Sequence, residues 1–311
     1  MIRQIFRDSK PSTQLFFSAF VLIICGLVVT LLGMGLARVI YGVNLSDIAR
    51  MMQDLSNPEN ISILKFFQTI QSIGIFLIPP FIIAWMLHGN PSVYLQVNKA
   101  PTFQSALIVV AIIFFSNPLI NWLNEINAKL TLPEWLNSVQ IWMQNSENQA
   151  NKLTEAFLST KLLSTLLLNI LMIGILPAIG EELVFRGVVQ RLFKKMYGNV
   201  HVAIWISAAL FSALHLQFFG FLPRLVLGAM FGYMLEWSGT LWLPMIAHFV
   251  NNTSAVIIFY LVKNGNMENA LDKTGTWADG SFYLVIVSLL FLFVLFKALY
   301  LRRAATLATI D

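Results

Sequence analysis

Residues 162–179 read LLSTLLLNILMIGILPAI and contain no charged side chain. A helix of about 20 apolar residues crosses the hydrocarbon core of a bilayer, so this segment has the length and character of a transmembrane helix. The whole chain is similar, because its 311 residues are 57% hydrophobic and 11% charged, against about 25% charged residues in a typical soluble domain. The composition predicts a polytopic membrane protein. It excludes a soluble cytosolic protein, a disordered chain and a nucleic-acid binder, and the single cysteine, Cys25, excludes a disulfide scaffold.

Eight apolar segments predict an all-α fold, a polytopic transmembrane helical bundle forming a single membrane domain over residues 1–311. The first segment is longer than the core of a signal peptide, so we expect an uncleaved signal anchor. Pro79 and Pro80 should kink the second segment or end it early. The eight segments are approximately Gln14–Ala37, Phe66–Leu87, Phe103–Leu123, Leu162–Ile179, Val200–Gln217, Leu222–Glu236, Leu241–Val262 and Ser281–Tyr300.

Two polar connections predict amphipathic helices at the membrane surface. One covers residues 46–55, with Ser46 as its N-cap. The other lies within residues 124–161, where Pro133 is placed to start a helix that carries Trp135 and Trp142. Tryptophan side chains favour the headgroup level, so we expect this helix to lie in the interface.

The distribution of lysine and arginine predicts the orientation of the chain. If the N-terminus is inside and there are eight spans, the inside segments are short and dense in basic residues, as the positive-inside rule requires. We therefore expect both termini in the cytoplasm. The inside basic residues are Arg3, Arg7, Lys10, Lys99, Arg191, Lys194, Lys195, Lys297, Arg302 and Arg303.

Charged residues follow the fourth apolar segment directly, in the sequence Gly180-Glu181-Glu182-Leu-Val-Phe-Arg186. Ionisable groups inside a membrane are costly and usually functional. Glu182 and Arg186 are four residues apart and can pair on one helix face. Glu181 points about 100° away from Glu182, and is left to face another helix. The alternative is a charge cluster at the headgroups where the helix ends.

Two further polar clusters lie in later segments. His215 belongs to Phe211-Ser-Ala-Leu-His215, and His248 and Asn252 share a helix face in the seventh segment. Pro244 precedes His248 by one turn, and a tilt or a kink there would bring His248 level with the other groups. The alternatives are a packing role for His215 and interhelical hydrogen bonds for His248 and Asn252.

The small residues Gly228 and Gly232 of the sixth segment form one face of the expected helix. Small residues four positions apart let two membrane helices approach closely. We expect this face to serve packing alone.

Together the clusters supply a carboxylate, two imidazoles and a carboxamide. A glutamate base with imidazole and amide donors can direct water onto an amide carbonyl. Glu181, His215 and His248 could instead hold a zinc ion with water as the fourth ligand. The sequence leaves both possibilities open, so the cofactor is either zinc or none. The His-Glu-x-x-His zinc motif and a Gly-x-Ser nucleophile motif are absent from the sequence.

The three motifs, Glu-Glu-x-x-x-Arg, Phe-x-x-x-His and His-x-x-x-Asn in this order, resemble those of the CPBP intramembrane proteases. This group contains the type II CAAX prenyl endopeptidases and bacterial bacteriocin-processing or immunity proteins. The resemblance covers residues 177–252, which we expect to be the catalytic core. It implies a multi-pass endopeptidase of a bacterial cytoplasmic membrane, with a peptide or lipidated peptide as its substrate and the lipid bilayer as its other partner.

The resemblance also implies roles for six residues. Glu181 would activate water with help from His215, and His248 and Asn252 would form the oxyanion site. Glu182 and Arg186 would support them. A different class of function remains open from the residues alone, namely a non-proteolytic immunity or binding protein, or a proton-linked transporter whose relay uses the same carboxylate and histidines.

Overall fold

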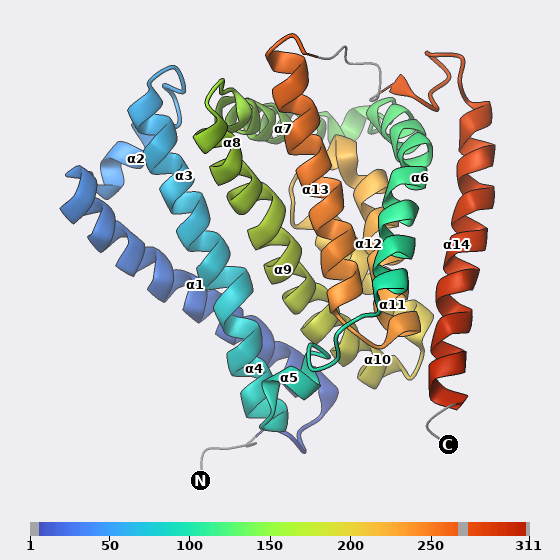
Figure 1. Cartoon of the computed structure of the whole chain (residues 1–311). Coiled ribbons are helices and arrows are strands. Elements are labelled where there is room, and N and C mark those ends of the chain that lie inside the picture. Colours follow the sequence, from blue (N-terminus) through green and yellow to red (C-terminus); the bar gives the residue numbers. More distant parts are fainter. Residues whose placement is uncertain (1–5, 267–272, 309–311) are drawn as a thin grey trace.

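The computed structural model describes residues 6–266 and 273–308, and the regular elements of these ranges are helices, with no strand (Figure 1). Arg3, one of the basic residues used to predict orientation, lies outside the described residues. The helices are α1 (Pro11–Tyr41), α2 (Leu45–Met51), α3 (Pro58–Ser72), α4 (Ile78–His88), α5 (Pro91–Tyr94), α6 (Phe103–Ala128), α7 (Asn137–Leu158), α8 (Leu163–Asn169), α9 (Leu176–Glu182), α10 (Arg191–Tyr197), α11 (Val200–Ala213), α12 (Phe221–Ser238), α13 (Trp242–Lys263) and α14 (Tyr283–Ala308).

Short π-helical and 3₁₀ segments connect several of these helices. The π-helical segments Ile73–Leu77, Ile170–Ile175 and Leu183–Gln190 make α3 continuous with α4 and α8 continuous with α9 and α10. The 3₁₀ turns are Glu134–Leu136 and Phe218–Gly220, which precede α7 and α12.

Seven helical stretches in the described residues are long and apolar enough to cross a membrane. They are Pro11–Tyr41, Pro58–His88, Phe103–Ala128, Leu163–Tyr197, Phe218–Ser238, Trp242–Lys263 and Tyr283–Arg302. The predicted membrane bundle is confirmed, and each stretch includes a predicted segment or most of one.

The predicted span Val200–Gln217 is wrong in its length. Its helix, α11, has 14 residues and ends at Ala213, which is too short to cross the hydrocarbon core. Leu216 then takes a left-handed backbone conformation with φ of 54°. Arg224 donates to the backbone oxygen of Gln217 at 2.9 Å and to its side-chain oxygen at 2.6 Å. These hydrogen bonds hold the chain in a turn, so His215 lies just beyond the helix.

The second predicted span, Phe66–Leu87, differs from the structure at its start and at its prolines. The helix begins at Pro58, and Lys65 is buried within it, where its ammonium donates to Asn169 at 2.8 Å. Pro79 and Pro80 do not end the helix, which continues to His88. The π-helical turn directly before them provides the local change in winding that prolines, which lack an N–H, commonly require.

Both predicted surface helices are present, although α2 ends at Met51 and not at residue 55. α2 is capped by Asn44 rather than by Ser46, because the Asp47 carboxylate accepts from the Asn44 N–H at 2.9 Å and completes a capping box. α7 follows a 3₁₀ turn that starts directly after Pro133. Trp135 and Trp142 on this segment are exposed. In Figure 1, α7 runs across one end of the bundle.

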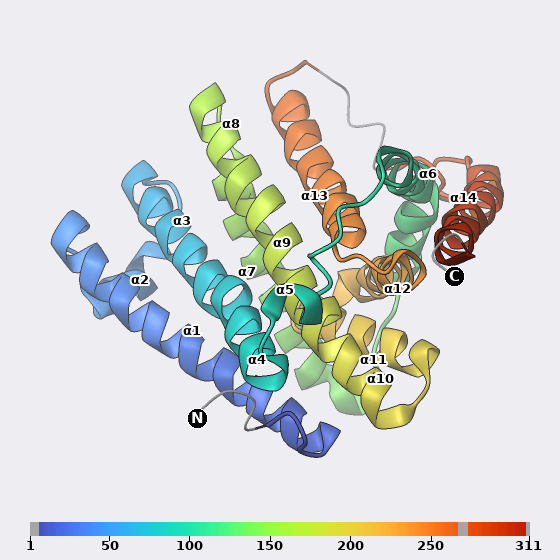
Figure 2. The ribbon, with the colours of Figure 1, turned by 60° about the horizontal axis from the view of Figure 1, so that its bottom comes forward.

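The bundle is arranged around α12. In the most apolar 18 residues of the stretch that contains α12, 56% of residues are buried. The corresponding part of α1 has 17% of its residues buried. α12 packs on α11, α6, α13 and α14, while α1 and α14 lie at opposite edges of the molecule (Figures 1 and 2). Large apolar side chains such as Phe16 of α1 and Phe293 of α14 are exposed there. Such exposed apolar faces are those expected of helices that contact lipid.

Candidate active site

The two acidic residues belong to one long helix with π-helical turns. Glu181 and Glu182 end α9, and Arg186 lies in the π-helical segment that follows. π-Helical turns occur often at functional sites, because they shift side chains relative to a regular helix. Gly180 lets this helix approach its neighbour, since a Cβ there would lie 2.7 Å from the Cβ of Phe76. The helix is therefore tightly packed where it carries its charges.

Glu182 and Arg186 form a fully buried ion pair. The Glu182 Oε1 accepts from Arg186 Nη1 at 2.8 Å, and both side chains have no exposed surface. Arg186 Nη2 also donates to the backbone oxygen of Gly228 at 2.9 Å. The guanidinium lies over the rings of Phe211, at 4.6 Å, and Phe231, at 5.3 Å. Hydrogen bonds and ring faces thus offset the cost of burying this charge.

His248 connects the two glutamates. Its Nδ1 donates to Glu182 Oε1 at 2.9 Å, and its Nε2 lies 3.9 Å from Glu181 Oε2. The ring stacks on Phe231 with centroids 5.1 Å apart. Because a carboxylate only accepts, the contact with Glu182 places a hydrogen on Nδ1 and turns Nε2 toward Glu181.

No proline kink brings His248 to this position. Pro244 is the third residue of α13, where a missing N–H removes no bond from the helix, because the first four N–H groups have no partner within it. The expected kink at Pro244 is therefore not the cause. α13 packs directly on α9 and on the π-helical segment Ile170–Ile175, and this packing brings His248 to the glutamates.

His215 and Asn252 are each held by a backbone carbonyl. His215 Nδ1 donates to the oxygen of Phe211 at 2.7 Å, which leaves Nε2 of a neutral ring as an acceptor. Asn252 Nδ2 donates to the oxygen of Ile173 at 3.0 Å, and its Oδ1 accepts from Asn251 Nδ2 at 3.1 Å. The amide group of Asn252 has two N–H donors, so one remains after the bond to Ile173.

A cavity of about 320 Å³ collects four of the predicted residues: Glu181, His215, His248 and Asn252 all line it. The amphipathic helix α7 closes one side with Leu153, Thr154 and Phe157. Glu182 and Arg186 do not line this cavity and lie behind His248. The structure thus separates the six predicted residues into four that face a cavity and two that hold one of these four in place.

The predicted zinc ligands are not arranged as a metal site. In the part of the chain that the structure describes, no three His, Cys, Asp or Glu side chains are grouped closely enough to hold a metal ion. Glu181, His215 and His248 share the cavity, and their donor chemistry would suit zinc. The placement of these three side chains does not suit zinc. A metalloendopeptidase is therefore not supported, and the proposed mechanism uses no metal.

Sequence reasoning missed three residues at the site. Phe231 stacks on His248, Arg224 lines the cavity, and Phe211 contacts Arg186, His215 and His248. Phe211 is the first residue of the Phe-x-x-x-His motif, so the sequence did provide a reason to place it at the site. Phe231 and Arg224 belong to no motif, and the sequence contains 25 phenylalanines, so nothing distinguished Phe231 from a packing residue.

Most of the residues that line this cavity, which we call the Glu181 cavity, belong to a segment that matches a known family. Residues 163–254 match the family model described as type II CAAX prenyl endopeptidase Rce1-like. This segment is therefore a Rce1-like family domain, which we call the Rce1-like domain. The domain runs from the start of α8 into α13 and contains all six predicted residues. α7, which closes the cavity, lies outside the Rce1-like domain.

One similar curated protein is the uncharacterized protein YpbD of Bacillus subtilis (strain 168), which is 34% identical over 80 residues. The match covers 24% of this chain and 38% of that protein, so the chain spans well under half of this relative. No solved structure matches the chain. The predicted family resemblance is confirmed for the Rce1-like domain.

Proposed function

We propose that this protein is an intramembrane endopeptidase that hydrolyses a peptide bond with a water molecule activated by Glu181. The observation that carries the proposal is the convergence of Glu181, His215, His248 and Asn252, from α9, the end of α11 and α13, on one cavity. Glu181 Oε2 is buried and has no hydrogen-bond partner among the described residues. A carboxylate oxygen placed in a cavity in this way can accept a proton from water.

The reaction needs one base, one oxyanion site and one proton donor. Glu181 takes a proton from water, and the oxygen attacks the carbonyl carbon of the substrate to give a tetrahedral oxyanion. His215 Nε2 accepts a hydrogen bond from the same water and orients it. The proton then passes from Glu181 to the amide nitrogen as the C–N bond breaks, which leaves a carboxylic acid and an amine.

The oxyanion is stabilised by His248 and Asn252. The remaining N–H of Asn252 can donate to it directly. His248 can donate from Nε2 only when both ring nitrogens carry hydrogen, because Nδ1 already donates to Glu182. The Glu182 carboxylate accepts that Nδ1–H and balances the ring's positive charge, as the aspartate of a Ser-His-Asp triad does for its histidine. Arg186 fixes Glu182 in turn, so Glu182 and Arg186 are positioning residues.

The proposed substrate is a peptide or lipidated peptide that reaches the cavity from the membrane, including one cleaved by CAAX-type C-terminal processing. The family description of the Rce1-like domain supports this class. The proposed location is a bacterial cytoplasmic membrane with both termini in the cytoplasm. The beginning of α1 and the end of α14 lie at the same end of the bundle although seven helical stretches are long enough to cross it (Figure 1). The short helix α11 starts at the end where α12 stops, since Lys194 before α11 pairs with Glu236 of α12. This arrangement supports placing both termini on one side.

The test is a cleavage assay in detergent with a prenylated CAAX peptide and a panel of membrane peptides. Wild type should cleave at least one of them, and Glu181→Ala, His215→Ala and His248→Ala should each lose about 10²-fold or more in rate. Glu134→Gln is the matched control, because Glu134 is an exposed glutamate in the turn before α7. If cleavage persists in all three alanine variants, the mechanism is wrong. If wild type cleaves nothing while the variants abolish biological activity, a binding or transport function replaces the protease.

A further inference from the structure

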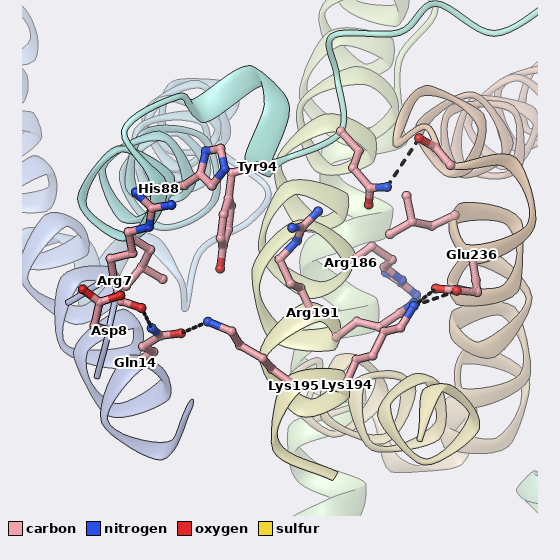
Figure 3. A pocket seen from close by; sticks show the side chains of 15 residues that line it. Arg7, Asp8, Gln14, His88, Tyr94, Arg186, Arg191, Lys194, Lys195 and Glu236 are labelled. Atoms are coloured by element: carbon pink, nitrogen blue, oxygen red, sulfur yellow. Dashed lines mark hydrogen bonds and ion pairs between the residues drawn. The ribbon is translucent and has the colours of Figure 1, made fainter. Parts of the chain in front are cut away.

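A second cavity, at the opposite side of Arg186 from the Glu181 cavity, is basic. Its volume is about 650 Å³, and it lies among the start of α1, the end of α4, α5, α10 and the end of α12 (Figure 3). Five cationic side chains line it, against two acidic ones, Asp8 and Glu236. The cations are Arg7, Arg186, Arg191, Lys194 and Lys195. We call this space the basic pocket.

Arg186 and Lys194 each form an ion pair with a glutamate. Arg186 pairs with Glu182, and Lys194 binds both oxygens of Glu236 at 2.7 and 2.9 Å. Arg191 instead lies over the ring of Tyr94, 4.6 Å from its centroid, and Lys195 donates to the neutral amide of Gln14 at 3.3 Å. Neither of these two contacts supplies a negative charge, although the Glu236 carboxylate that binds Lys194 also attracts Arg191. Figure 3 shows Lys195 reaching from α10 toward Gln14 of α1, and Arg191 beside Tyr94.

Buried polar atoms at the wall of the basic pocket also lack partners. Within residues 6–266 and 273–308, Tyr94 Oη, Gln190 Oε1 and Arg186 Nε have no hydrogen-bond partner, although all three residues are more than nine-tenths buried. Unpartnered polar atoms are expensive inside a protein. Burial raises the pKa of Tyr94 to about 12, although Arg191 acts against the shift. The phenol is therefore protonated and able to donate to an anion.

We propose that the basic pocket binds the phosphate group of an anionic lipid headgroup. Arginine and lysine are the usual phosphate-binding side chains, and Arg191 can offer a planar pair of donors. Four apolar helices begin or end at the pocket, α1, α4, α10 and α12, which places it where headgroups lie. Basic pockets between membrane helices recognise such headgroups. The site is distinct from the Glu181 cavity and needs no proteolytic activity.

The test is lipid binding to the full chain in a neutral detergent, followed by native mass spectrometry. The probes are phosphatidylglycerol, phosphatidylcholine and inorganic phosphate. Wild type should retain phosphatidylglycerol in preference to phosphatidylcholine, and Arg191→Gln/Lys195→Gln should lose about tenfold or more of that preference, because each basic residue near an anionic headgroup contributes several-fold in affinity. Lys195→Gln alone, at an exposed side chain, gives the same direction if the double variant does not fold.

The matched control is Lys10→Gln/Lys99→Gln, which removes the same charge from exposed lysines that do not line the pocket. It should keep the preference of wild type. If inorganic phosphate displaces phosphatidylglycerol from wild type but not from Arg191→Gln/Lys195→Gln, the free phosphate and the lipid phosphate bind at the same site. The proposal is wrong if the two double variants lose binding equally, or if wild type retains both lipids equally and does not bind inorganic phosphate. None of these readouts depends on cleavage, so the outcome is separate from that of the proposed function.

Discussion

Glu182 and His248 are 66 residues apart in the sequence, and Glu182 Oε1 lies 2.9 Å from His248 Nδ1 in the buried centre of the bundle. The same oxygen accepts from Arg186. One glutamate oxygen therefore fixes both a buried cation and the histidine that faces Glu181. This arrangement assigns different tasks to two adjacent glutamates, with Glu182 holding the site together and Glu181 facing the cavity.

Glu182→Gln should destabilise the protein and reduce activity. The change leaves the Arg186 guanidinium buried without its counter-charge, and breaking a buried ion pair from one side costs about 3–5 kcal/mol. We expect a clear fall in the thermal unfolding midpoint in detergent, compared with Glu134→Gln at the exposed surface. Adding Arg186→Met to Glu182→Gln should recover much of that stability without recovering activity. An unchanged midpoint for the single variant would show that the pair contributes nothing to the fold.

Gly232→Ala should destabilise the packing of α12. A Cβ at Gly232 would lie 2.7 Å from Gln190 Oε1 and 2.9 Å from Ile204 Cγ2. Overpacking of this kind costs about 1–3 kcal/mol. Gly35→Ala in α1 is the control, because a Cβ there meets nothing within 4 Å. Alanine favours a helix over glycine by about 1 kcal/mol, so Gly35→Ala should be neutral or stabilising. Equal unfolding midpoints for the two variants would contradict the close contact of Gly232 with Gln190 and Ile204.

Metal chelation should leave cleavage intact. The described His, Cys, Asp and Glu side chains include no group of three placed to hold a metal, and the proposed mechanism uses only the chain's own groups and water. We expect the rate with a strong chelator to stay within about twofold of the untreated rate, since general-base catalysis by Glu181 needs no ion. Loss of activity that returns on adding zinc would instead support the Glu181, His215 and His248 ligand set.

Local sequence patterns predicted the bundle and four of the residues that line the cavity. The lengths of the apolar segments alone located the membrane helices, because the thickness of the bilayer sets how many apolar residues a spanning helix needs. Spacing of four residues on a helix predicted the Glu182–Arg186 pair that the structure contains. The cost of polar groups in a membrane singled out Glu181, His215, His248 and Asn252, and all four line one cavity.

Features that depend on tertiary contacts could not be predicted in this way. α11 ends at Ala213, and the chain that follows it is bound by Arg224 through Gln217. The hydropathy of a segment carries no information about such a contact. Lys65 is buried because Asn169, 104 residues away, accepts its hydrogen bond. Gly228 and Gly232 predicted packing, and their backbone oxygens also accept from Arg186 and Gln190. Periodicity within a segment carries no information about a partner in another helix.

The central claim is that Glu181 is the base, and Glu181→Gln tests it most directly. Glutamine keeps the shape of the side chain and removes its ability to take a proton. Since Glu181 Oε2 makes no hydrogen bond in the described part of the chain and lies 3.9 Å from His248 Nε2, the unfolding midpoint should stay close to that of wild type. The single-turnover rate of peptide cleavage should fall by about 10²-fold or more, as loss of a general base requires. A Glu181→Gln variant that cleaves within about threefold of the wild-type rate would contradict the account.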